Sequence, residues 1–118
     1  MSILRPLPAV FFKTDAGNEP VREWLKDMSK EERTLVGIDI KTVQYCWPVG
    51  KPLVDSLGDG LWEIRTRLSD TIARTIFFER DQAIVLLHGF IKKTKKTPPQ
   101  DKKLSLQRKK AYIYATKK

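Results

Sequence analysis

Two groups of basic side chains in this sequence have the chemistry to hold a phosphate. Arg65, Arg67 and Arg74 lie in stretches where apolar and polar residues alternate with the two-residue period of β-strands. The second group directly follows the most apolar run of the chain and consists of Lys92, Lys93, Lys95 and Lys96. Guanidinium groups bind phosphate through paired hydrogen bonds, and ammonium groups add positive charge. We therefore expect a polyanion to bind at these residues, and RNA in particular.

The distribution of charge along the chain supports a localised site. Residues 92–118 contain 11 Lys and Arg against the single acid Asp101, whereas residues 1–91 contain 12 Lys and Arg against 13 Asp and Glu. The excess of +9 in the 118-residue chain therefore belongs to this basic C-terminal segment, 92–118. Such segregation favours a nucleic acid or an acidic protein as partner, and a solvated, partly disordered tail is the alternative.

The same residue types could also cleave RNA. Cleavage without a metal ion requires that the 2′-hydroxyl loses a proton, that charge at the phosphorus is stabilised and that the leaving 5′-oxygen gains a proton. The three arginines are expected to stabilise that charge. Lysines of the block are candidates for phosphate contact and proton transfer, and the ring of Phe90 could stack on an unpaired base.

Two further side chains are second-rank candidates. Glu63 could act as a general base, although its closeness to Arg65 favours an ion pair. His88 is the only histidine, and its ordinary titration range lies near neutrality. On a two-residue period it shares a face with Phe90 and Ile84 in the apolar run, which favours a buried structural role.

Composition excludes several classes of protein. The single cysteine, Cys46, cannot form an internal disulfide and is expected to be a small buried residue at a helix end. The sequence offers no Cys/His cluster for zinc, so we expect no metal and no cofactor. No apolar run approaches the roughly 18 residues of a membrane span, and the N-terminus lacks the apolar region of a signal peptide. The expectation is a protein of the cytoplasm.

The pattern of residues predicts one α+β domain over 1–118, in the order β-α-α-β-β-β-α. Strands are expected at 10–12, 61–68, 72–79 and 83–90, in a small and mostly antiparallel four-stranded sheet. Asn18 should cap a first helix, and Ser29 with Glu32 should form the capping box of a second. These helices would form a hairpin against the sheet. A basic C-terminal helix would follow residue 101, with Leu104, Ala111 and Ala115 as its apolar stripe.

The arginines occupy two strands that a two-residue turn at residues 69–70 would join. In that hairpin Arg67 lies opposite Ile72 and Arg65 lies opposite Arg74, so the three arginines share one face. Like charges opposed in this way are destabilising, which favours a face that holds an anion. We expect the Arg74 side chain to be exposed, and its replacement by alanine to leave the protein folded.

Four stretches together resemble the phage-related HigB branch of the RelE/ParE toxin superfamily: residues 17–25, 60–65, 74–78 and 86–98. The resemblance spans roughly residues 10–105, and the expected element order agrees with the superfamily's fold. It implies that catalytic groups come from the middle strands and the end of the last strand. The candidate catalytic residues are then Arg65, Arg74, Lys92 and Lys93, and the candidate RNA-binding residues are Arg67, Phe90, Lys95 and Lys96.

The resemblance also implies a function. It implies the toxin of a type II toxin–antitoxin system, a metal-independent endoribonuclease that cleaves mRNA on the ribosome and is silenced by a cognate antitoxin with a helix-turn-helix. Two alternatives remain open at this point. The superfamily includes toxins that inhibit DNA gyrase and cut no RNA, and the chain could also be a non-catalytic module that binds RNA or the ribosome.

Overall fold

The computed structural model describes residues 5–93 and 95–117, so Thr94 within the lysine block lies outside the described residues. Along this part of the chain one strand is followed by two helices, then by four strands and a last helix. They are β1 (Ala9–Phe11), α1 (Pro20–Lys26), α2 (Lys30–Cys46), β2 (Val54–Gly58), β3 (Leu61–Arg67), β4 (Ile72–Arg80), β5 (Ala83–Lys92) and α3 (Pro99–Thr116). None of the helices described is long and apolar enough to cross a membrane.

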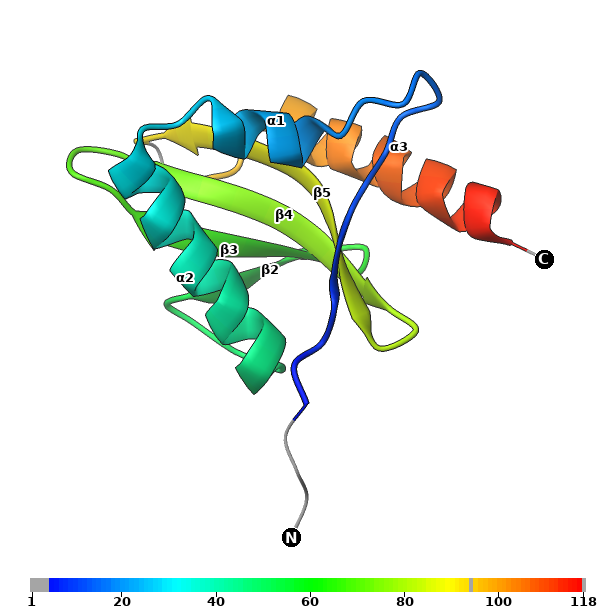
Figure 1. Ribbon diagram of the computed structural model, residues 1–118, viewed down its shortest axis with the longest axis horizontal. Coiled ribbons are helices and arrows are strands. Elements are labelled where there is room, and N and C mark those ends of the chain that lie inside the picture. The colour runs from blue at the N-terminus through cyan, green and yellow to red at the C-terminus, as the bar shows by residue number, and fades with distance from the viewer. Residues whose placement is uncertain (1–4, 94, 118) are drawn as a thin grey trace, which may run out of the picture.

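The strands form one mixed sheet in the order β1-β5-β4-β3-β2 (Figure 1). β1 pairs with β5 in parallel, and the remaining neighbours are antiparallel. The α+β class is therefore confirmed, but the described residues form five strands and not the four that we predicted. The missed strand, β2, has the sequence Val-Asp-Ser-Leu-Gly, and Asp, Ser and Gly are depleted in strands. Pairing with β3 holds it in the sheet despite that composition.

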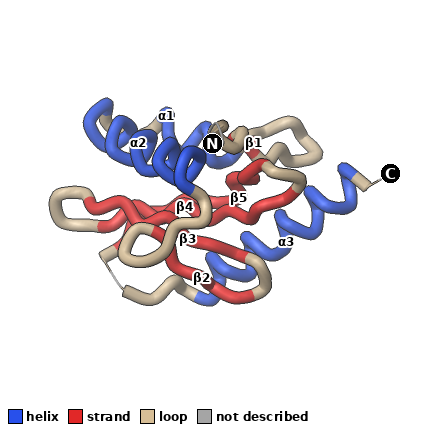
Figure 2. Tube along the Cα trace, turned by 90° about the horizontal axis from the view of Figure 1, so that it is seen from below, coloured by secondary structure: helices blue, strands red, loops and turns tan. Residues whose placement is uncertain are grey.

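Helices cover both faces of the sheet. Figure 2 shows α1 and α2 on one face and α3 on the other. The first core lies under α1 and α2 and includes Val36, Val43 and Phe77, and the second lies under α3 and includes Phe78 and Leu87. The C-terminal helix is present as predicted, but the prediction of which residues form its apolar stripe was wrong. The α3 side chains in the second core are Leu106, Tyr112 and Ile113, whereas Ala111 and Ala115 are exposed.

Two details of the helical hairpin follow from local sequence. The capping box of α2 is present, because the Ser29 hydroxyl accepts from the Glu32 backbone N–H while the Glu32 carboxylate accepts from the Ser29 N–H. The N-cap residue of α1 is Glu19 and not Asn18, and the Glu19 side chain makes no capping hydrogen bond to the backbone of the first turn. Cys46, expected to be buried, is exposed at the end of α2.

α1 approaches the sheet closely at one glycine. A Cβ atom added to Gly89 would lie 2.1 Å from the Trp24 ring, far inside van der Waals contact. The absence of a side chain at this position of β5 lets the Trp24 ring pack directly against the strand, three residues before the lysine block. The end of β5 is thereby packed from the side of α1, and the residues that follow start from a fixed backbone.

Candidate functional site

The candidate residues on the sheet lie in two rows that cross three strands. Arg65 of β3 is paired with Arg74 of β4, which is paired with Phe90 of β5. In the next row the pairs run from Arg67 to Ile72 and from Ile72 to Lys92. The predicted hairpin register is therefore confirmed. Paired residues of neighbouring strands project to the same face, so both rows belong to the α3 face of the sheet.

Arg74 does not have the exposure that we predicted. Its side chain is 0% exposed, and its Nη1 lies 3.0 Å from Oε1 of Glu63, which is itself 2% exposed. Arg65 is 25% exposed, and its Nε lies 3.8 Å from the same carboxylate oxygen. The expectation failed because Glu63 projects from β3 toward the arginines and neutralises their repulsion within the protein. Arg74 is thus a structural cation in the folded chain.

These buried groups hold the segment that carries the lysines. Nη1 of Arg74 donates to the backbone carbonyl of Lys95 at 3.1 Å, and Nη2 of Arg65 donates to the same oxygen at 3.3 Å. The hydroxyl of Thr97 donates to Oε2 of Glu63. Glu63 therefore acts as an anchor for the chain after β5, and each of its oxygens already has a partner. This arrangement supports the structural alternative for Glu63.

A basic hollow lies beside these anchors. It is at the end of β3 that extends past the first residue of β2. The volume of this hollow is about 560 Å³. Arg65 marks that end of β3, since its backbone N–H donates to the carbonyl of Leu53 at 2.8 Å. The described residues that line the basic hollow are Asp39, Pro52, Leu53, Arg65, Arg67, Ile72, Lys93 and Lys95. It thus combines basic side chains from β3 and from the segment after β5 with a small apolar wall.

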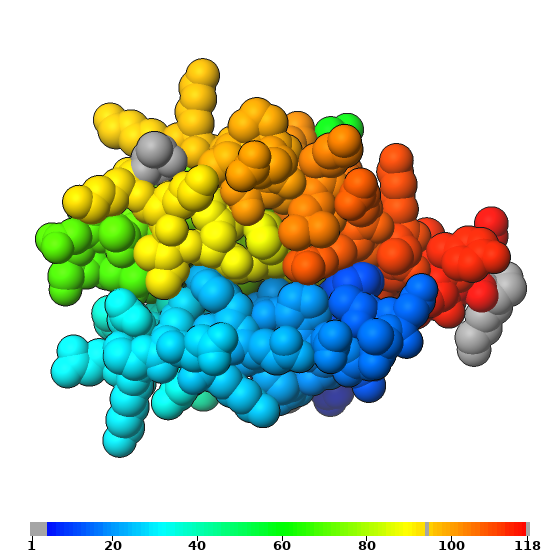
Figure 3. Space-filling view, turned by 90° about the horizontal axis from the view of Figure 1, so that it is seen from above, coloured from blue at the N-terminus to red at the C-terminus, as the bar shows by residue number. Residues whose placement is uncertain are grey.

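The remaining candidates lie outside the basic hollow. Lys92 and Lys96 are exposed, and neither lines it. Figure 3 shows the yellow end of β5, with described residues of the following segment protruding beside the start of orange α3. Phe90 is half-buried, and its ring stacks on His88 with centroids 5.5 Å apart. A base could therefore not use the face of Phe90 that His88 covers.

His88 joins β5 to α3. Its Nε2 lies 2.6 Å from Oδ1 of Asp101, and its Nδ1 lies 3.4 Å from Nη1 of Arg108. Because a guanidinium only donates, Nδ1 accepts and Nε2–H donates to the carboxylate, which describes a neutral imidazole. Burial lowers the pKa of His88, an effect that Arg108 reinforces and that Asp101 opposes. Burial also lowers the pKa of Arg108. The side chain of His88 is 14% exposed and does not line the basic hollow.

We expect the stability of the protein to fall as the pH drops below His88's ordinary pKa of 6.5. The lowered pKa means that the unfolded chain binds this proton more readily, so stability is full above pH 6.5 and is lost toward the pKa of the folded state. Urea unfolding at closely spaced pH values between 7.5 and 5.5 measures the slope, and His88→Gln should flatten it. An unchanged slope in His88→Gln would assign the pH dependence to other groups.

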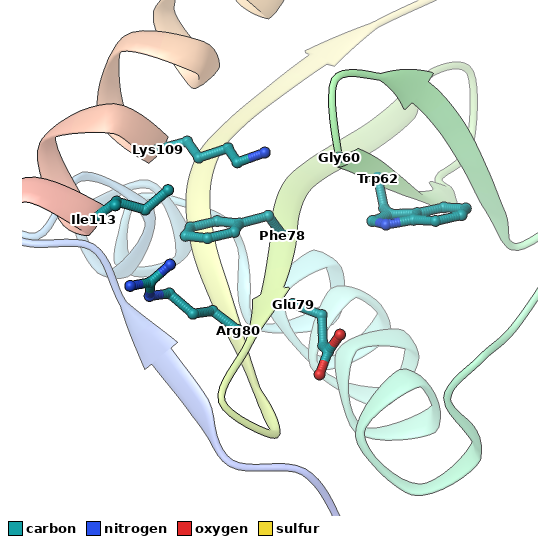
Figure 4. A pocket seen from close by; sticks show the side chains of 7 residues that line it. All are labelled: Gly60, Trp62, Phe78, Glu79, Arg80, Lys109 and Ile113. Atoms are coloured by element: carbon teal, nitrogen blue, oxygen red, sulfur yellow. The ribbon is translucent and has the colours of Figure 1, made fainter. Parts of the chain in front are cut away.

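A second hollow, of about 410 Å³, lies between α3 and the far end of β4 (Figure 4). None of the predicted site residues lines it. Its lysine, Lys109, donates to the backbone carbonyl of Asp59 at 2.6 Å, and its ammonium group lies 5.4 Å from the centre of the Phe78 ring. Lys109 therefore holds α3 against the β2–β3 turn. We assign this second hollow a structural role in packing α3 on the sheet.

Sequence reasoning missed four residues of the basic hollow: Asp39, Pro52, Leu53 and Ile72. Asp39 lies on α2, and Pro52 and Leu53 precede the strand that composition did not reveal. Ile72 was expected only as the hairpin partner of Arg67. One feature of the sequence singles out Asp39. It is a charged residue between two isoleucines, Ile38 and Ile40, on a helix that buries one face in the core. Its position beside the arginines follows only from how α2 crosses the sheet.

The fold and the hollow define a small α+β protein in which Arg65, Arg67, Lys93 and Lys95 line one hollow at the end of a mixed sheet. Residues 23–110 match the family described as phage derived protein Gp49-like (DUF891), and the chain belongs to this family of RelE/HigB-like toxins. The matched range runs from within α1 to within α3, and hence includes all the described residues that line the basic hollow. No curated protein matches the chain significantly.

Proposed function

We propose that this protein is the toxin of a type II toxin–antitoxin system and that it cleaves mRNA on the ribosome in the cytoplasm, without a metal ion. Its toxicity would be silenced by a cognate antitoxin with a helix-turn-helix. The observation that carries the proposal is the basic hollow, in which Arg65, Arg67, Lys93 and Lys95 line one space of about 560 Å³. Membership of a toxin-like, phage-derived family supports the same reading.

The basic hollow suits the charge that develops during RNA cleavage. The 2′-oxygen loses its proton and attacks the adjacent phosphorus, and the 5′-oxygen departs with a proton, which leaves a 2′,3′-cyclic phosphate and a 5′-hydroxyl. Arg65 and Arg67 would hold the non-bridging oxygens through their guanidinium groups. Lys93 or Lys95 would exchange the protons, since an arginine cannot.

The anchors behind the basic hollow supply rigidity. Arg74 and Arg65 both donate to the carbonyl of Lys95, so the backbone that carries the lysines is fixed next to β3. A site held in this way does not reorganise when charge appears on the substrate, which is the condition for strong electrostatic stabilisation. Arg74 would then act as a positioning residue. His88 would take no part in proton exchange, because Asp101 and Arg108 engage both of its ring nitrogens.

We expect the purified protein to cleave mRNA on programmed ribosomes and to leave the same message intact when it is free in solution. Free RNA is flexible, and a ribosomal A site that holds the message kinked would align the three reacting oxygens; alignment of this kind is worth up to about 7–11 kcal/mol. Primer extension on a short message, with and without ribosomes, measures the cleavage.

Growing bacteria supply the control for this experiment. Pulse labelling after induction should show rapid loss of translation while DNA synthesis continues. Loss of DNA synthesis with translation intact would point to gyrase as the target. Efficient cleavage of naked RNA would contradict the need for the ribosome. Normal growth, with no cleavage either on ribosomes or in free solution, would favour a non-catalytic module that binds RNA or the ribosome.

A further inference from the structure

Asp39 stands out among the residues that line the basic hollow. It is the only carboxylate among the described lining residues, and it comes from α2, on the side of the sheet opposite to α3. Within residues 5–93 and 95–117 its side chain makes no hydrogen bond and no ion pair, although basic side chains share the same space. A half-buried carboxylate without a partner in a basic hollow has acceptor oxygens available for a ligand.

The wall near Asp39 is apolar. Pro52, Leu53 and Ile72 line the basic hollow together with the acid. The volume of about 560 Å³ lies within the range of small-molecule sites, which is roughly 300–1,000 Å³. A single unstacked nucleotide matches this composition, since its flat base can cover the apolar wall while its phosphate meets the cations.

A carboxylate at the edge of such a base would discriminate between bases. An ionised carboxylate only accepts hydrogen bonds. Guanine presents two neighbouring donors on its Watson–Crick edge, N1–H and the N2 amino group, and can donate both to one carboxylate. Uracil presents one donor between two carbonyl oxygens, which the carboxylate repels. Adenine and cytosine each present an amino donor beside a ring nitrogen that accepts.

We propose that the basic hollow takes one unstacked nucleotide of the message and that Asp39 selects guanine there. The proposal rests on the proposed RNA-cleaving function for its substrate class and adds the residue that reads the base. Arg65 and the lysines would bind the phosphate of any nucleotide, whereas Asp39 would decide which base is held. A paired contact of this kind is worth roughly tenfold in discrimination.

Titration of the intact protein with mononucleotides, followed by NMR chemical shifts, tests the proposal without any need for cleavage. GMP should bind about tenfold more tightly than UMP, and also more tightly than IMP, which lacks the N2 amino group. Asp39→Asn should bind all three with similar affinity, because the amide replaces one acceptor oxygen by a donor. Asp27→Asn, which changes an exposed acid at the end of α1, is the matched control and should keep the preference.

The outcomes separate this proposal from the proposed function. Equal binding of GMP, IMP and UMP, or absence of GMP binding, would overturn the role of Asp39 even if the protein cleaves mRNA on ribosomes. A preference for GMP that Asp39→Asn retains would overturn it as well. Loss of the preference in Asp39→Asn alone supports it, whether or not cleavage is detected. Where cleavage is detected, mapped sites should contain guanine with the parent protein and lose that bias with Asp39→Asn.

Discussion

Replacement of Arg74 by alanine is expected to lower the free energy of unfolding by about 3–5 kcal/mol, because it leaves the carboxylate of Glu63 buried without the cation 3.0 Å from it. The carbonyl of Lys95 would lose one of its two guanidinium donors at the same time. A small domain is typically stable by about 5–15 kcal/mol, so this loss is a large fraction of the total. Urea unfolding followed by tryptophan fluorescence measures it.

Arg67→Ala is the matched control for this measurement. Arg67 lies on the same strand face as Arg65 but is exposed, and its removal should change the stability by no more than about 0.5 kcal/mol. If Arg74→Ala costs as little as Arg67→Ala, then Glu63 does not depend on Arg74 and the buried network has been misread. Loss of toxicity in Arg74→Ala cells would therefore report unfolding, so this variant cannot test catalysis.

The hairpin at the centre of the site could be predicted because its signals are local. Alternation from residue 61 onward separates the core face of β3 from the face of the arginines, and a two-residue turn leaves one register. The pairs Arg65 with Arg74 and Arg67 with Ile72 follow from those facts alone. The capping box that starts α2 is equally local, since its two side chains are three positions apart in the sequence.

The environment of Arg74 could not be predicted in the same way. Like charges opposed across a hairpin suggest an anion, but the sequence does not say whether that anion is a ligand or a side chain. Here it is Glu63, and its second oxygen is engaged by Thr97, which is 34 residues away in the sequence. The segment after β5 folds back over Arg65 and Arg74. This is a tertiary contact, and no local sequence pattern predicts it.

A shift within β5 limits what periodicity can predict about His88. The partner of Ile76 is His88, but the partner of the next residue, Phe77, is Leu86, so one extra residue enters β5. Ile84 therefore packs in the core under α1 and α2, whereas Phe90 packs on the α3 side. The expectation that His88 shares a face with Phe90 is confirmed, because their rings stack on the α3 side. The expectation that Ile84 shares that face was wrong, because a β-bulge breaks the two-residue period. Nothing in the apolar run from Ala83 marks the bulge.

The strongest effect on activity is expected from the two lysines that line the basic hollow. The double variant Lys93→Ala/Lys95→Ala should lower the rate of mRNA cleavage on ribosomes by on the order of 100-fold or more, because it removes the two ammonium groups of the basic hollow that we propose act at the scissile phosphate. Both side chains are exposed, so the variant should unfold at nearly the same urea concentration as the parent protein. Single-turnover cleavage of a short message measures the rate.

The double variant Lys92→Ala/Lys96→Ala is the matched control, because it removes the same charge from the same segment but outside the basic hollow. It should weaken binding to ribosomes and flatten the salt dependence of that binding, while bound complexes still cleave at a rate close to that of the parent. Lys93→Arg and Lys95→Arg then separate charge from proton transfer, since each keeps the cation and removes an amine that can exchange a proton. If the two double variants lose cleavage equally, total charge and not the basic hollow governs activity, and the reaction must take place elsewhere on the protein.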